Sequence, residues 1–144
     1  FHFQGFSHSL PIEQFPLEQI SSRRAKINVY QPINYPATAL VLENQDIKKL
    51  AAEAYGIVEQ IKEPSSLNAL LLRVEGKNRI YILPRSKPKS EHYSNSPASV
   101  EMCGMLIFSK SVDKAKYDDP DLNLVEKVLK DVTISKENLD FKLL

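Results

Sequence analysis

The chain has 144 residues, 42% of them apolar and 26% charged, which is the composition of a single globular domain. Its 19 basic and 18 acidic side chains leave a net charge of +1, which argues against a broad surface for nucleic acid or membranes. One cysteine, Cys103, cannot form an internal disulfide, and no Cys/His cluster is present, so we expect no structural zinc site. We assign no metal ligands and no cofactor to the chain, and whether the full-length protein binds a metal stays open. We expect a cytoplasmic protein with one domain over residues 1–144 and, because the sequence starts at Phe1, a fragment of a longer protein.

The N-terminal third of the chain is predicted to form strands and turns. Aromatic and polar residues alternate over residues 1–6, which predicts a strand. Pro11 and Pro16 predict a loop after it. Two β-prone runs follow, at residues 25–30 and 37–42, with a Pro- and Asn-containing turn between them.

The next segment predicts the most regular helix of the chain. Apolar residues recur at helical spacing over residues 47–61 and give one apolar stripe of about four turns. Asn44 is the predicted N-cap, with Asp46 in the first turn, and Pro64 is expected to close the helix.

The C-terminal half predicts a hairpin, a strand and a second helix. Residues 67–74 and 79–83 predict the two strands of a β-hairpin. The polar, proline-containing segment 84–97 predicts an exposed, mobile loop, and residues 99–108 predict another strand. Apolar spacing within residues 122–132 predicts a helix. Together these elements predict an α+β domain with an antiparallel sheet and helices on one face.

The first four residues carry the best candidate for a nucleophile. On a strand His2 and Gln4 point to the same face. A neutral imidazole can attack phosphorus and leave later as a neutral group, and a nearby amide can hydrogen-bond the phosphoryl oxygen as charge develops. Two alternatives remain open at this stage: a structural or exposed histidine, and a cleaved purification tag, which Phe3-Gln4-Gly5 also resembles.

Three ordered motifs resemble those of one enzyme family. His2-Phe3-Gln4-Gly5-Phe6, followed by Leu10-Pro11-Ile12-Glu13, resembles the active-site strand of the GDP-L-galactose and GDP-D-glucose phosphorylases, whose pattern is His-x-His-x-Gln. Arg79-Ile80-Tyr81-Ile82-Leu83-Pro84 is similar to their Arg-x-x-x-Leu-Pro strand. Ser96-Pro97-Ala98-Ser99-Val100-Glu101-Met102-Cys103-Gly104 is similar to their Asn-Pro-Ala-x-x-Glu-Met-Ser-Gly segment. The resemblance extends loosely to about Val132.

This resemblance implies both a fold and a mechanism. The family belongs to the galactose-1-phosphate uridylyltransferase branch of the histidine triad superfamily, so the chain would be the catalytic strand plus the C-terminal half of such a domain. His2 would attack the α-phosphorus of a GDP-hexose and expel hexose 1-phosphate, and inorganic phosphate would then release GDP. Ser96 in place of Asn, and Met105 where plant members have His, leave the identity of the sugar open.

Four other residues are candidate substrate-binding groups. Arg85 and Lys87 lie in a basic segment that is expected to bind a phosphate, the alternative being a solvated loop. Glu101 lies on the predicted apolar strand and would hold a hydroxyl or a neighbouring base, or else face solvent. Glu13 would orient a ligand or a histidine, or lie on the surface. Cys103 has no supporting His-Asp pair and is predicted to be a buried structural residue.

The expected partners follow from the implied reaction. They are a nucleotide sugar and inorganic phosphate, together with the missing N-terminal half of the protein or a homodimer partner. Two rival hypotheses stay open. One is a dinucleoside polyphosphate phosphorylase of the same superfamily, and the other is a non-catalytic scaffold or pairing module.

Overall fold

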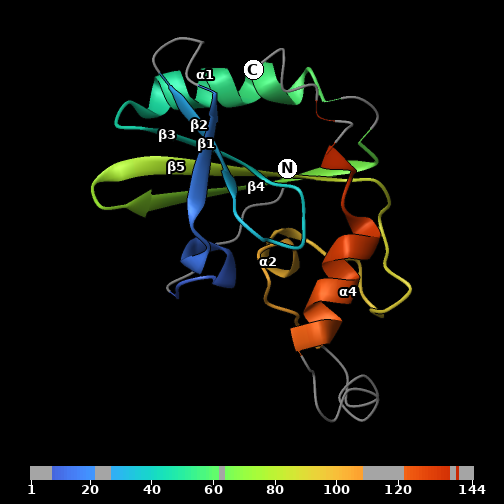
Figure 1. Cartoon of the computed structure of the whole chain (residues 1–144). Helices are drawn as coiled ribbons and strands as arrows, with labels where there is room; N and C mark the ends of the chain where they lie inside the picture. The colour runs from blue at the N-terminus through green and yellow to red at the C-terminus, as the bar shows by residue number, and fades with distance from the viewer. Residues whose placement is uncertain (1–7, 22–26, 62–63, 109–121, 137–138, 140–144) are drawn as a thin grey trace.

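The computed structural model describes residues 8–21, 27–61, 64–108, 122–136 and 139. Within them a five-stranded antiparallel sheet has the strand order β1-β2-β3-β5-β4 (Figure 1). Its strands are β1 Leu17–Ser21, β2 Asn28–Pro32, β3 Leu40–Asn44, β4 Ser66–Val74 and β5 Lys77–Arg85. The helical elements are η1 Pro11–Gln14, α1 Ile47–Val58, α2 Ser99–Met102 and α4 Leu122–Val132. The predicted α+β class with an antiparallel sheet is confirmed.

The sheet carries apolar clusters on both of its faces. The central strands β3 and β5 contain unbroken buried runs, Leu40–Leu42 and Tyr81–Leu83. Because neighbouring residues of a strand point to opposite faces, such runs need cover on both sides. α1 covers one face, while α2 and α4 lie beyond the other (Figure 1). The sequence indicated helical cover on one face, and the structure adds the second layer.

The β4–β5 hairpin forms as predicted and runs in continuous register from Ser66 opposite Arg85 to Val74 opposite Lys77. Its turn has two residues with positive φ, Glu75 at 50° and Gly76 at 80°. The hairpin therefore places Arg85, the last residue of β5, at the opposite end of the sheet from the turn.

The cap of α1 differs from the prediction. Asp46, not Asn44, is the N-cap, since its Oδ1 accepts hydrogen bonds from the backbone N–H groups of Lys48 at 3.0 Å and Lys49 at 3.2 Å. Asn44 instead accepts from the backbone N–H of Asp46 at 2.8 Å. The sequence also missed β1, which pairs with β2. The strand predicted for residues 1–6 lies outside the described residues.

The strand predicted for residues 99–108 is wrong, because the segment begins with the short helix α2. Glu101 closes the first turn by accepting the backbone N–H of Ala98 at 3.0 Å. The helix ends where Gly104 adopts φ 96°, with hydrogen bonds from the N–H of Gly104 to Glu101 O and from the N–H of Met105 to Val100 O. This pair of bonds is a Schellman motif, whose positive φ favours glycine.

Among the residues that the structure describes, no helix is both long and apolar enough to cross a lipid bilayer.

Candidate substrate-binding site

The predicted site residues divide into three groups. His2 and Gln4 lie outside the described residues, so the structure gives no geometry for the predicted nucleophile. Arg85 and Glu101 are both buried, at 8% and 7% exposure, and they interact electrostatically. Glu13 accepts a backbone N–H of its own turn, and Lys87 pairs with Asp131 of α4.

Arg85 is held by the segment that follows it. Its Nη1 donates to the backbone oxygens of Pro88, at 3.1 Å, and Pro97, and to Ser96 Oγ at 3.3 Å. Ser96 in turn donates to Pro88 O. The segment 84–97 was predicted to be an exposed loop, but Pro84 belongs to β5 and Ser90, Tyr93 and Pro97 are buried. Nη1 thereby connects Pro88, near the start of the segment, with Pro97 at its end, because a terminal guanidinium nitrogen carries two N–H groups.

Burial lowers the pKa of Arg85, and the negative charge of Glu101 partly opposes this shift. Glu101 Oε2 accepts the N–H of Ala98, and its Oε1 lies 3.3 Å from the Tyr93 hydroxyl. That hydroxyl also bonds Ile107 O and accepts the N–H of Ile107 at 3.2 Å. Burial raises the pKa of Tyr93, so it stays a neutral phenol. Tyr93 is the polar partner that the sequence did not indicate, since it lay in a predicted exposed loop.

Glu13 stabilises η1 rather than projecting from the surface. Its Oε1 accepts the backbone N–H of Leu10 at 2.6 Å, and it is half-buried. Its charge acts on Cys103, as does that of Glu101, so the two carboxylates lie near the same thiol. Burial is the main cause that raises the pKa of Cys103 to about 12, which keeps it a protonated thiol. The predicted burial of Cys103 is confirmed.

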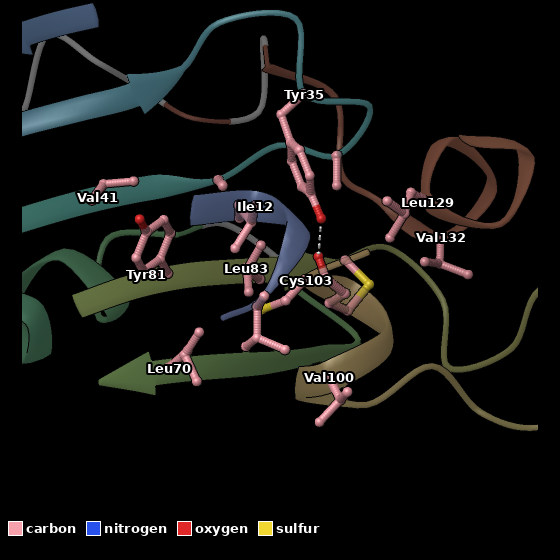
Figure 2. Packing of buried hydrophobic residues seen from close by; sticks show 14 residues of the cluster. Ile12, Tyr35, Val41, Leu70, Tyr81, Leu83, Val100, Cys103, Leu129 and Val132 are labelled. Atoms are coloured by element: carbon pink, nitrogen blue, oxygen red, sulfur yellow. Dashed lines mark hydrogen bonds between the residues drawn. The ribbon is translucent and has the colours of Figure 1, made fainter. Parts of the chain in front are cut away.

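The turn that contains Cys103 is hydrogen-bonded to the loop between β2 and β3. Tyr35 reaches from this loop toward the turn, and its hydroxyl donates to Met102 O at 2.7 Å (Figure 2). The N–H of Ile12 donates to Cys103 O at 3.1 Å. Leu129 and Val132 of α4 complete the same apolar cluster (Figure 2). η1, α2 and α4 therefore contribute to one apolar cluster, and the buried Glu101 lies on α2.

Lys87 pairs with α4. Its Nζ lies 2.5 Å from Asp131 Oδ1, and the other oxygen of Asp131 accepts from Ser90 Oγ and from the N–H of Glu91, both at 2.9 Å. The side chain of Lys87 is 38% exposed, so it stays in contact with solvent. Of the two candidate cations in this segment, Arg85 is thus buried, and Lys87 is half-exposed with its charge already balanced by Asp131.

These features define an α+β domain with a buried arginine and glutamate beside the end of a β-hairpin. The chain belongs to the family described as "GDPGP1-like, C-terminal domain", whose model matches residues 11–141. His2 and Gln4 precede the matched range. Searches of curated proteins and of solved structures give no significant match. This match supports the resemblance to the GDP-hexose phosphorylase family that was noted from the sequence.

Proposed function

We propose that the chain is part of a GDP-hexose phosphorylase with a histidine-triad active site, in which His2 is the nucleophile and Gln4 binds the phosphoryl oxygens. The observation that carries the proposal is the family match over residues 11–141. The motif around His2 supports it, because the sequence predicts an imidazole and an amide on one face of a strand, which would suit nucleotidyl transfer. The nucleotide sugar and inorganic phosphate are the proposed ligands.

The proposed reaction has two displacements. A ring nitrogen of His2 attacks the α-phosphorus of the GDP-hexose, the Pα–O bond to the β-phosphate breaks, and hexose 1-phosphate leaves. An oxygen of inorganic phosphate then attacks the same phosphorus, the P–N bond breaks, and GDP leaves. Each step forms one bond to phosphorus and breaks one, so no oxidant or metal is needed for balance.

The described candidates have different roles in this proposal. Arg85 and Glu101 are proposed to face the substrate, because they are the buried charged pair beside the hairpin end. Glu13 and Lys87 act as positioning residues, since one holds η1 and the other holds α4 against the segment after β5. Both therefore shape the site through the elements that they fix.

The proposal is tested by trapping the intermediate in the full-length protein that contains this chain. The protein is incubated without phosphate with GDP-glucose or GDP-galactose labelled at the α-phosphorus, and the acid-labile label is mapped by peptide analysis. We expect the label on His2 and its release as GDP when phosphate is added. His2→Asn should abolish labelling, whereas His8→Asn, which changes an exposed histidine nearby, should keep it.

Two outcomes would contradict the proposal. Absence of label with every GDP-hexose and with diadenosine tetraphosphate would favour a non-catalytic module. Label from diadenosine tetraphosphate alone would favour a dinucleoside polyphosphate phosphorylase.

A further inference from the structure

Three polar atoms at the β4–β5 end that lies away from the turn are buried without a hydrogen-bond partner. They are Ser66 Oγ, Asn68 Nδ2 and Arg85 Nε, and none finds an acceptor within the described part of the chain. A buried donor that lacks an acceptor costs about 1–3 kcal/mol, and protein interiors contain few of them. Three such atoms on adjacent strands therefore indicate that an additional oxygen-bearing group belongs there.

The strand register brings the three side chains to one face of the sheet. Ser66 lies directly opposite Arg85, and Asn68 follows two residues along β4, so it points to the same side. Leu70, two residues further, belongs to the apolar cluster that α2 and α4 cover. α2 packs against β4 and carries Glu101, so the unpartnered atoms lie in the same layer as the buried carboxylate.

All three groups can act as hydrogen-bond donors to the same ligand. The Nη1 group of Arg85 is occupied by Pro88, Ser96 and Pro97, which leaves the edge of the guanidinium that carries Nε. Ser99 Oγ donates to Asn68 Oδ1 at 3.5 Å, which leaves the amide nitrogen of Asn68 as the unpartnered atom. A hydroxyl, an amide and a guanidinium together are complementary to an acceptor-only group, and the cation favours an anionic one.

The charge of the cluster also favours an anion. Arg85 is 8% exposed, and no direct hydrogen bond to Glu101 is present among the described contacts of its guanidinium. The oxygens of Glu101 are instead engaged by Ala98 and Tyr93. A buried guanidinium that lacks a directly bonded carboxylate is stabilised when an oxyanion binds its free edge.

We propose that Ser66, Asn68 and Arg85 form an oxyanion site that binds an oxygen of a phosphate group. Identifying the oxyanion as phosphate rests on the proposed function, in which both inorganic phosphate and hexose 1-phosphate carry this group. Ser66 and Asn68 are thereby assigned as substrate-binding residues that the motifs around His2, Arg79 and Ser96 did not include. Arg85 keeps the phosphate-binding role expected from the sequence and gains two partners on the neighbouring strand.

The test measures phosphate binding directly in the 144-residue chain. The chain is titrated with inorganic phosphate at fixed ionic strength and followed by its melting temperature and by phosphorus NMR. We expect a melting temperature that rises with phosphate, because a ligand that binds the folded state stabilises it. Ser66→Ala and Asn68→Ala should each weaken the apparent affinity roughly tenfold or more, the loss expected for one hydrogen bond to a charged group.

Matched variants separate binding from folding. Ser65→Ala changes the exposed neighbouring serine and should leave phosphate affinity unchanged. In phosphate-free buffer Ser66→Ala should be as stable as the parent or slightly more stable, since it removes an unpaired buried hydroxyl. Arg85→Lys keeps the charge but loses Nε, so it should bind phosphate more weakly. If that variant does not fold, the Ser66 and Asn68 variants still decide the matter.

Competition with glucose 1-phosphate identifies the source of the group. Tighter binding than inorganic phosphate assigns the site to the leaving group, and weaker binding assigns it to the attacking phosphate. A melting temperature that does not respond to millimolar phosphate, or an unchanged affinity in both alanine variants, would overturn the inference and leave only a structural water there. Because the His2 label forms without phosphate, labelling without phosphate binding would reject this site and keep the proposed function.

Discussion

At the scale of single residues, Asp131, which is half-buried on α4, has more partners than the sequence indicates. It is the anchor for the segment after β5, through Lys87, Ser90 and the N–H of Glu91. The hydrogen bond from Lys87 is the main cause that lowers the pKa of Asp131 from 3.8 to about 2, and partial burial opposes it. The candidate site therefore depends on the ion pair between Lys87 and Asp131, of which the sequence indicated only the basic partner.

Asp131→Asn should destabilise the fold by about 1–2 kcal/mol, because it weakens partly exposed, charge-assisted hydrogen bonds. The folded pKa is depressed, so the stabilising contribution is complete above the ordinary value of 3.8 and is lost as the pH falls through about 2. Urea unfolding at several pH values should show the difference between parent and variant shrinking over that window.

Glu126→Gln is the matched control on the same helix. Its pair with Lys130 is an exposed i,i+4 contact, with side chains 49% and 63% exposed. Its removal should cost no more than about 0.5 kcal/mol. Equal effects of the two variants would contradict the anchoring role of Asp131.

At the scale of elements, local periodicity predicted the helices and strands whose own sequence favours their structure. α1, α4 and the β4–β5 hairpin have apolar spacing or turn residues that repeat over many positions, and their predicted extents overlap the observed ones. β1 was missed because its sequence, Leu17–Ser21, is mostly polar and becomes a strand by pairing with β2. Such a strand depends on tertiary context, which overrides weak local preference.

The strand predicted at α2 was wrong for a different reason. Val100 and Met102 alternate with other residues as in a strand, and a segment of four residues is too short to separate the two periods. The available signals were Glu101, which caps the first turn, and Gly104, which ends the helix. Both act through hydrogen bonds to or between backbone groups, so a search for apolar spacing does not detect them.

Gly104→Ala tests this helix end. Gly104 has φ 96°, and an added Cβ would lie 3.0 Å from Pro11 Cβ, so we expect a loss of about 1–3 kcal/mol in unfolding free energy. Gly56→Ala is the control with the opposite sign. Gly56 lies within α1 with nothing within 4 Å of a new Cβ, and alanine should stabilise the helix there by about 0.5–1 kcal/mol. A neutral Gly104→Ala, measured by the same urea unfolding, would contradict the Schellman geometry.

At the scale of the whole molecule, the candidate site is a product of long-range packing. Arg85 and Glu101 are near each other because α2 returns to β4 after the segment that follows β5. No local pattern encodes this proximity, so the sequence identified Arg85 through its basic segment and Glu101 through its motif, but not that the two lie near each other. The same holds for Ser66 and Asn68, whose importance depends on the register with β5.

The two apolar clusters share the central strands, which makes the sheet the common support of the fold. Leu42 and Leu83 lie on neighbouring strands β3 and β5, both fully buried, and belong to opposite clusters. Leu42→Ala and Leu83→Ala should each cost about 2–5 kcal/mol, from lost burial and the cavity left behind. Leu71→Ala changes a leucine that is 56% exposed and should cost no more than about 0.5 kcal/mol.

This role of the sheet is tested by asking whether each substitution destabilises one layer of the fold or the whole domain. Because β3 and β5 contribute to both clusters, we expect a single cooperative transition with either substitution, coincident by far-UV circular dichroism and by tyrosine fluorescence. Amide exchange in α1 should then accelerate for Leu83→Ala as well as for Leu42→Ala, although α1 packs only with the cluster of Leu42 among the described contacts. Acceleration confined to the mutated face would mean that the two layers unfold separately, and the sheet would not be their common support.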